Sequence, residues 1–160
     1  MSKISFIILI LYRFYYYVLY GLKISRHQRV TIKGLRNINI LNSLKIGINT
    51  EGFVSGSDKT YLNIKGELII KGCWSIGRGC RVYVAPGGIM EIGNGGYVNS
   101  FTDFIIGDKL VIGNNCIISW KCQFLNEDNH IIEYKDRKQK TKEIIIGNHV
   151  WIGSNVKIHA

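Results

Sequence analysis

Apolar residues recur at every sixth position along most of this chain. A helix requires apolar spacing of about 3.6 residues and an ordinary amphipathic strand requires a spacing of about 2, so neither template fits. A fixed period of this kind indicates internal repeats. The series, of which the first is weakest, are Ile32, Ile38 and Leu44; Ile64, Ile70, Ile76 and Val82; Ile92, Val98 and Phe104; Ile106, Ile112, Ile118 and Phe124; and Ile146, Ile152 and Ile158.

Each six-residue unit also has a small-residue pattern. Glycine directly follows the apolar residue at Gly77, Gly93, Gly107, Gly113, Gly147 and Gly153. A small or branched residue stands four places after the apolar residue at Cys80, Cys116, Cys122, Val150 and Val156. Each unit therefore predicts a short strand ending in a sharp corner. Triangular coils that stack like residues in columns satisfy this pattern, so the chain is predicted to be an all-β, parallel β-helix. An antiparallel sandwich is the alternative, but hairpin signals are few.

Two runs with these units carry a resemblance to a known family. The run IGNNCIISWKCQFLNEDNH, and after a loop IIIGNHVWIGSNVKI, resembles the left-handed β-helix acyltransferases of the hexapeptide-repeat family. Within that family it is most similar to sugar O-acetyltransferases of capsule, lipopolysaccharide and exopolysaccharide clusters. The resemblance covers roughly residues 60 to 158. It implies left-handed winding, a homotrimer, acetyl-CoA as acyl donor and a sugar or polysaccharide precursor as acceptor.

The six-residue period breaks between Phe124 and Ile146, where 22 residues replace a step of six. About sixteen residues are therefore predicted to form one extruded loop, within residues 125–145, and such loops on rigid solenoids often carry function. Histidine suits removal of a hydroxyl proton near neutral pH, which makes His130 the candidate general base. The family resemblance implies an Asp-x-His pair at the loop start, which Asp128 and His130 match. A solvent-exposed loop histidine is the alternative.

Four further residues are candidates for binding the substrates. The resemblance places the His-Val-Trp-Ile-Gly segment along the cofactor groove, so Trp151, Gly153 and Ser154 are expected to contact the pantetheine of acetyl-CoA. A tryptophan at a coil corner can equally seal a trimer interface. Trp120 precedes the loop and is expected to face the acceptor, whereas Trp74 is expected to be packing.

No metal site is expected. Zinc bound by His130, His149 and His159, as in β-helical carbonic anhydrases, requires a third histidine at the chain end, and His149 is predicted to point outward. The four cysteines occupy positions where small side chains pack and form no paired framework, so reduced thiols without a metal or nucleophile role are expected.

The chain length of 160 residues predicts one domain, preceded by a distinct N-terminal segment. The formal net charge is +10, and residues 1–36 contain no acidic residue. The apolar run Ile4 to Leu22 is interrupted by Arg13, so residues 1–30 are interpreted as a basic, apolar N-terminal helix, followed by a β-helix domain at 31–160. A helix on the inner, cytoplasmic membrane surface, a cap buried over the domain and a true span stay open; a signal peptide fits worse.

These observations favour an acetyl-CoA-dependent O-acetyltransferase of surface polysaccharide biosynthesis. The alternatives are a non-catalytic or truncated β-helix scaffold in a polysaccharide-synthesis complex and a nucleic-acid binder, the latter disfavoured because the basic residues lie in an apolar segment. Relatives of this kind continue for several hexads that contribute to the coenzyme A groove, whereas this sequence stops at Ala160. A truncated product, a fragment and a natural short form are all compatible with it, and catalytic competence depends on which applies.

Overall fold

The computed structural model describes residues 23–48, 54–127 and 143–160. Within these ranges the chain is almost entirely β, as the six-residue period predicts. Most of the predicted N-terminal helix and the candidates Asp128 and His130 lie outside the described residues. Strand β1 (Ile24–Arg26), which falls inside the segment 1–30, already pairs with the sheet that follows.

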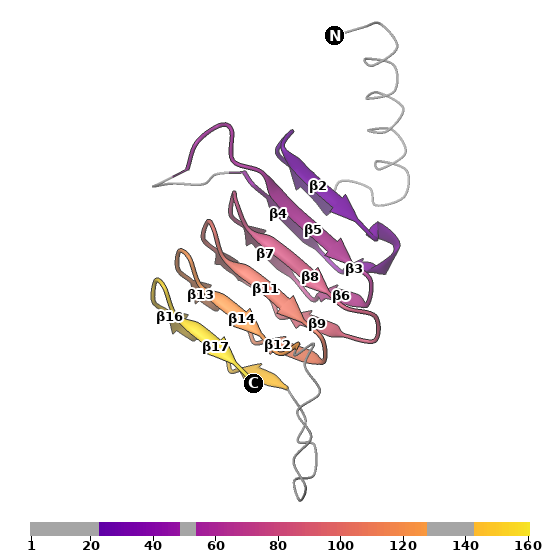
Figure 1. The fold of residues 1–160 in the computed structure, drawn as a ribbon, viewed down its shortest axis with the longest axis vertical. Helices are drawn as coiled ribbons and strands as arrows, with labels where there is room; N and C mark the ends of the chain where they lie inside the picture. Colours follow the sequence, from indigo (N-terminus) through magenta and orange to yellow (C-terminus); the bar gives the residue numbers. More distant parts are fainter. Residues whose placement is uncertain (1–22, 49–53, 128–142) are drawn as a thin grey trace, which may run out of the picture.

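The described strands form three parallel sheets, called A, B and C, which the chain visits in turn (Figure 1). Sheet A contains β1, β4 (Ser43–Ile46), β7 (Cys73–Ile76), β10 (Gly96–Val98), β13 (Ile117–Ile118) and β16 (Trp151–Ile152). Sheet B contains β2 (Val30–Lys33), β5 (Thr60–Ile64), β8 (Arg81–Val84), β11 (Asp103–Ile106), β14 (Gln123–Leu125) and β17 (Lys157–His159). Sheet C contains β3 (Ile38–Ile40), β6 (Glu67–Ile70), β9 (Ile89–Ile92), β12 (Lys109–Ile112) and β15 (Ile144–Ile146).

This A-B-C order repeated along the chain is that of a parallel β-helix, consistent with the left-handed winding that the resemblance implies. Every strand pair within a sheet is one coil apart and parallel, and Figure 1 shows the coils stacked from β2 to β17. Isoleucines of the six-residue series are expected to point into the coil, and they are buried: Ile70 and Ile118 are 0% exposed, and Ile76 and Ile112 are 1% exposed. The prediction of stacked coils is confirmed.

The coil is two residues longer than three uniform hexads. Phe104 pairs with Phe124, and Leu62 with Val82, so successive coils are 20 residues apart at these points. The extra dipeptide lies on sheet B, whose strands carry three inward positions where the other sheets carry two; Thr102, Phe104 and Ile106 are an example. Phe124 therefore stacks on Phe104, although the six-residue series would place it over Ile106.

Insertions interrupt the coil at more than one corner. Paired residues of β4 and β7 are 30 positions apart in the sequence, ten more than in a 20-residue coil. The ten extra residues lie between Ile46 and Thr60, at the corner joining sheets A and B. Paired residues of β12 and β15 are 34 positions apart, fourteen more than in a 20-residue coil. These fourteen extra residues lie between Leu125 and Ile144, at the corner joining sheets B and C. The prediction of a single extruded loop is therefore wrong: the earlier insertion was missed because the period is weak before Ile64.

The core is a set of side-chain columns inside the coil. Phe104 and Phe124 form a stacked pair with ring centroids 4.8 Å apart and planes 9° apart. Their columns are flanked by fully buried aliphatic residues from all three sheets. This spacing matches the separation of hydrogen-bonded strands, about 4.8 Å, so coil stacking and ring stacking reinforce each other.

An asparagine ladder supports the corner that joins sheets C and A. The Oδ1 atom of Asn94 accepts from Cys73 N at 2.9 Å, that of Asn114 from Asn94 N at 2.8 Å, and that of Asn148 from Asn114 N at 2.7 Å. Each asparagine thus satisfies a main-chain donor of the preceding coil, which strand pairing does not reach at a corner. The sequence signal is the Ile-Gly-Asn triplet that precedes each of these corners.

No helix in the part of the chain that the structure describes is long and apolar enough to cross a bilayer.

We expect Phe124→Ala to lower the free energy of unfolding by about 3–5 kcal/mol, because it removes a fully buried ring and leaves a cavity between coils. Ile145→Ala is the matched control: Ile145 points outward from the neighbouring strand and is 67% exposed, so its truncation should change stability by about 0.5 kcal/mol or less. Urea unfolding followed by circular dichroism measures both. Similar losses in the two variants would contradict the inward assignment of Phe124.

Candidate functional site

The candidate binding residues Trp120, Trp151, Gly153 and Ser154 come together near the corner that joins sheets A and B, in two successive coils. Trp151 begins β16, stacks over Ile117 and is 75% exposed, so its ring is presented to solvent. Gly153 and Ser154 follow β16 directly, and Trp120 occupies the equivalent corner one coil earlier. The structure therefore gathers all four predicted binding residues on one edge of the coil.

Polar contacts hold this corner in place. Trp151 Nε1 donates to the Ser119 Oγ at 3.2 Å, and Asn155 N donates to the Trp120 carbonyl at 2.9 Å. Beneath them, the buried Thr102 Oγ1 donates to the Ser119 carbonyl at 3.1 Å and accepts from Cys122 N at 3.2 Å. Sequence reasoning missed Ser119 and Thr102, and their only signal is that they are hydroxyl residues at corner positions of an apolar repeat.

Exposure distinguishes the other two tryptophans. Trp74 is 2% exposed and packs in the core over Gly96, which agrees with its expected packing role. Trp120 is half-buried, and its Nε1, like that of Trp74, is buried with no hydrogen-bond partner among the described residues. A buried donor without a partner costs about 1–3 kcal/mol, so both indole N–H groups carry this cost and neither by itself indicates a ligand.

The loop that contains Asp128 and His130 leaves the coil at a different corner. Asn126, which is 1% exposed, fixes its first residues: its Oδ1 accepts from Gly107 N at 2.9 Å and its Nδ2 donates to the Lys109 carbonyl at 2.9 Å. This corner joins sheets B and C, so strand β14 and the width of sheet B separate the loop base from Trp120. The roles of Asp128 and His130, which lie outside the described ranges, stay predictions.

The remaining histidines lie on separate parts of the coil. His149 is exposed at the corner joining sheets C and A, as the sequence predicts, with a left-handed backbone (φ 57°). His159 lies on β17 in sheet B, and its Nε2 is 3.0 Å from Gln123 Oε1. Among residues 23–48, 54–127 and 143–160, no three His, Cys, Asp or Glu side chains gather to hold a metal ion.

Three of the four cysteines pack inside the coil. Cys80 and Cys116 are 0% exposed and Cys122 is 2% exposed, whereas Cys73 is exposed, which differs from the packing position expected of all four. Burial raises the pKa of the Cys80 thiol to about 12 and also raises the pKa of Cys122. Cys122 Sγ donates to the Gly153 carbonyl of the next coil at 3.1 Å. These protonated thiols are unsuited to nucleophilic catalysis.

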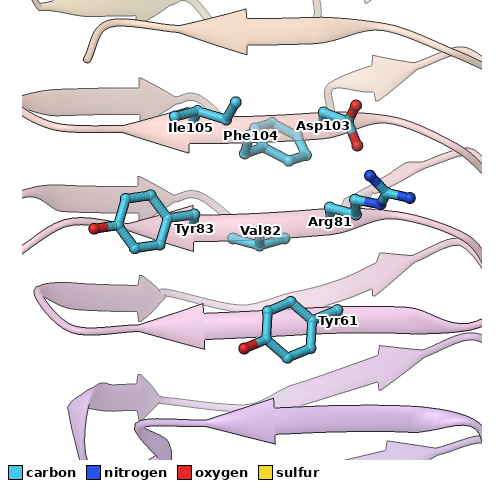
Figure 2. Close-up of a pocket in the computed structure, with 7 residues that line it drawn as sticks. All are labelled: Tyr61, Arg81, Val82, Tyr83, Asp103, Phe104 and Ile105. Carbon is cyan, nitrogen blue, oxygen red and sulfur yellow. The ribbon is translucent and has the colours of Figure 1, made fainter. Parts of the chain in front are cut away.

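A groove on the outer face of sheet B is a concave region that sequence reasoning missed. Its volume is about 240 Å³, and Figure 2 shows its lining side chains on three successive coils. The residues stand 20 or 22 positions apart in the sequence, so only the coil length, and not the six-residue period, relates them. The lining residues are Tyr61, Arg81, Val82, Tyr83, Asp103, Phe104 and Ile105.

The chain is similar in sequence to known proteins. It is 33% identical over 137 residues to an uncharacterized 24.8 kDa protein in the cps region of Klebsiella pneumoniae. It is 42% identical over 53 residues to the polysialic acid O-acetyltransferase of Neisseria meningitidis. These matches cover 84% and 31% of this chain. The chain spans 61% and 25% of the two relatives.

No protein-family profile matches the chain, and no solved structure matches it. The chain is homologous to the cps-region protein and to the O-acetyltransferase, and its three parallel sheets of stacked strands are consistent with a left-handed β-helix. The resemblance drawn from the sequence is thereby confirmed.

We expect iodoacetamide at mildly alkaline pH to modify Cys73 in the folded chain well before Cys80, Cys116 and Cys122. The thiolate is the reacting form, and burial together with raised pKa values keeps Cys80 and Cys122 protonated. Mass spectrometry of peptides taken over a time course measures each site, and urea-unfolded chain, in which all four should react, is the control. Modification of Cys80 in the folded chain as fast as Cys73 would contradict the burial of this column.

Proposed function

We propose that the chain is the coil-forming part of an O-acetyltransferase that moves an acetyl group from acetyl-CoA to a sugar hydroxyl in surface polysaccharide biosynthesis. The observation that carries this proposal is the 42% identity to a polysialic acid O-acetyltransferase. The longer match to a protein in a cps region supports the polysaccharide setting. The corner that gathers Trp120, Trp151, Gly153 and Ser154 supplies an aromatic wall and main-chain groups suited to pantetheine.

In the proposed mechanism the sugar hydroxyl attacks the thioester carbonyl directly. His130 removes the hydroxyl proton as the new C–O bond forms, and Asp128 orients the imidazole and stabilises the imidazolium. Main-chain N–H groups stabilise the oxyanion. Collapse of the tetrahedral intermediate breaks the C–S bond, and the imidazolium returns its proton to the coenzyme A thiolate. No covalent acyl-enzyme is formed, in keeping with burial that raises the pKa values of Cys80 and Cys122.

We further propose that the enzyme is a homotrimer with left-handed coils, in which neighbouring copies share each site. The support is the position of the two half-sites: the loop base at Asn126 lies at one corner of the triangle, and Trp120 and Gly153 lie at another. Three-fold packing of triangular coils side by side can bring a loop corner of one copy against a binding corner of the next. Trp151, exposed on sheet A, would be covered in that arrangement.

Substitution His130→Ala should lower acetyl transfer by about 10²–10⁴ fold, because the hydroxyl would lose its general base. The matched control is His149→Asn, which changes an exposed histidine on another corner to a residue that tolerates the left-handed backbone found there. Steady-state assays with acetyl-CoA and a polysaccharide acceptor measure both, and thermal melting should be unchanged. Near-normal turnover in His130→Ala would refute the assignment; no transfer by the wild-type chain would favour the non-catalytic scaffold.

We also propose that residues 1–22 attach the protein to the inner face of the cytoplasmic membrane. Support comes from the sequence of this segment, which combines a long apolar run with basic and no acidic residues.

Deletion of residues 2–22 should abolish co-sedimentation with anionic vesicles and leave the circular dichroism of the coil unchanged, since the first sheet strand begins at Ile24. Vesicles of neutral lipid are the control for the electrostatic part of binding. Undiminished sedimentation of the shortened chain with anionic vesicles would contradict the anchor.

A further inference from the structure

We propose that the groove on the outer face of sheet B binds an anionic saccharide and leads the acceptor chain to the extruded loop. The acceptor role rests on the proposed function, whereas saccharide binding rests on the geometry of the groove alone. Its lining combines aromatic rings, a guanidinium and a carboxylate on strands β5, β8 and β11 (Figure 2). Nothing in the acyl-transfer chemistry above uses these residues.

The register of sheet B sets the shape of the groove. Tyr61, Arg81 and Asp103 form one outward column, and Tyr83 and Ile105 belong to the column beside it. Val82 and Phe104 point inward between the two columns and are 1% exposed, so the groove floor is the strand backbone. Successive coils are about 4.8 Å apart, which repeats similar contacts along the solenoid axis. A linear polymer of similar units suits such a surface.

The side-chain chemistry favours a sugar over a purely apolar ligand. Tyr61 and Tyr83 offer ring faces for the C–H faces of a pyranose. Their hydroxyls can donate hydrogen bonds to sugar hydroxyls or accept them, and the Asp103 carboxylate can accept them. Burial raises the pKa of Asp103, although the Arg81 guanidinium opposes that change. The same burial partly shields the Asp103 carboxylate from water, and hydrogen bonds to a shielded carboxylate are stronger than those in water.

Charge around the groove favours an acidic saccharide. Arg81 lines it, Lys33 Nζ lies 5.8 Å from the Tyr61 ring centroid, and Lys65 Nζ lies 5.7 Å from that of Tyr83. These three cations outnumber the single carboxylate of Asp103. The two lysines also hold the tyrosine rings by cation–π contact, which pre-organises the aromatic walls.

The groove continues toward the proposed catalytic loop. Ile105 at its upper end pairs with Leu125 on the next coil, and Asn126 follows as the anchor of the loop base. An acceptor that lies along sheet B would therefore pass the loop base at Asn126, one coil further toward the C-terminus than the groove.

The test is direct binding of oligosaccharides to the full chain without acetyl-CoA, by isothermal titration calorimetry. The probes are an oligogalacturonate, a neutral maltooligosaccharide of equal length and a short polyglutamate. We expect oligogalacturonate to bind best, and Tyr61→Ala and Arg81→Gln each to weaken it by about three- to tenfold, as loss of one aromatic or charged contact should. Tyr61→Phe, which keeps the ring, should retain most of the affinity.

Matched controls lie on other parts of the coil. Tyr97→Ala removes a tyrosine of similar exposure from sheet A (41% against 36% for Tyr61), and Arg36→Gln removes an exposed arginine from the short helix η2 (Leu35–Asn37). Neither should change binding. Circular dichroism establishes that each variant is folded.

Several outcomes would overturn the proposal. Absence of oligogalacturonate binding, equal binding of polyglutamate, or equal binding of the neutral sugar would each refute an anionic saccharide site. Binding that survives Tyr61→Ala and Arg81→Gln but is lost in Trp151→Ala would place the saccharide at the A–B corner instead. Groove binding by a chain that transfers no acetyl group would uphold this inference and refute the proposed function, so the two fail separately.

Discussion

Main-chain hydrogen bonds between successive coils determine the register of everything else in this structure. Asp103 N bonds to the Cys122 carbonyl at 2.9 Å and Gln123 N to the Val156 carbonyl at 2.9 Å, and bonds of this kind run up all three sides. Because strands in register place like positions above one another, one coil fixes which residue of the next faces inward. The apolar columns, the asparagine ladder and the outward columns all follow from that register.

The sequence predicted the coil because inward side chains alone impose the six-residue period. It could not predict that sheet B is two residues wider, since Phe104 and Ile106 are both apolar and either fits the series. The first insertion escaped notice for a similar reason: Ile46 and Thr60 border a stretch where only pairing with other coils defines the register. A period in one dimension identifies repeats but leaves their alignment to main-chain pairing.

The roles of the candidate site residues stay predictions, but the structure places those that it describes. Trp120, Trp151, Gly153 and Ser154 share an edge, because they lie near the corner between sheets A and B in two successive coils. The sequence could not predict that the loop after Leu125 begins at another corner, because this depends on the triangular cross-section. Residues close in sequence can therefore lie on different faces of a coil, and residues on one face, such as Tyr61 and Arg81, can lie a whole coil apart. The sheet B groove could not be predicted for the same reason, because its lining residues come from three successive coils.

The loop base at Asn126 and the corner that carries Trp120 and Gly153 lie apart on one copy. The proposed enzyme therefore depends on neighbouring copies that share each active site. The most direct measurement mixes His130→Ala, which lacks the proposed base, with Trp151→Ala, which lacks the proposed pantetheine contact. The two variants are unfolded and refolded together, and acetyl transfer is assayed. If loop and binding corner come from neighbouring copies, some sites in mixed oligomers contain both intact halves, and activity should return above that of either variant refolded alone. Activity that stays at the level of the separate variants, in oligomers shown to be mixed, would contradict the shared site.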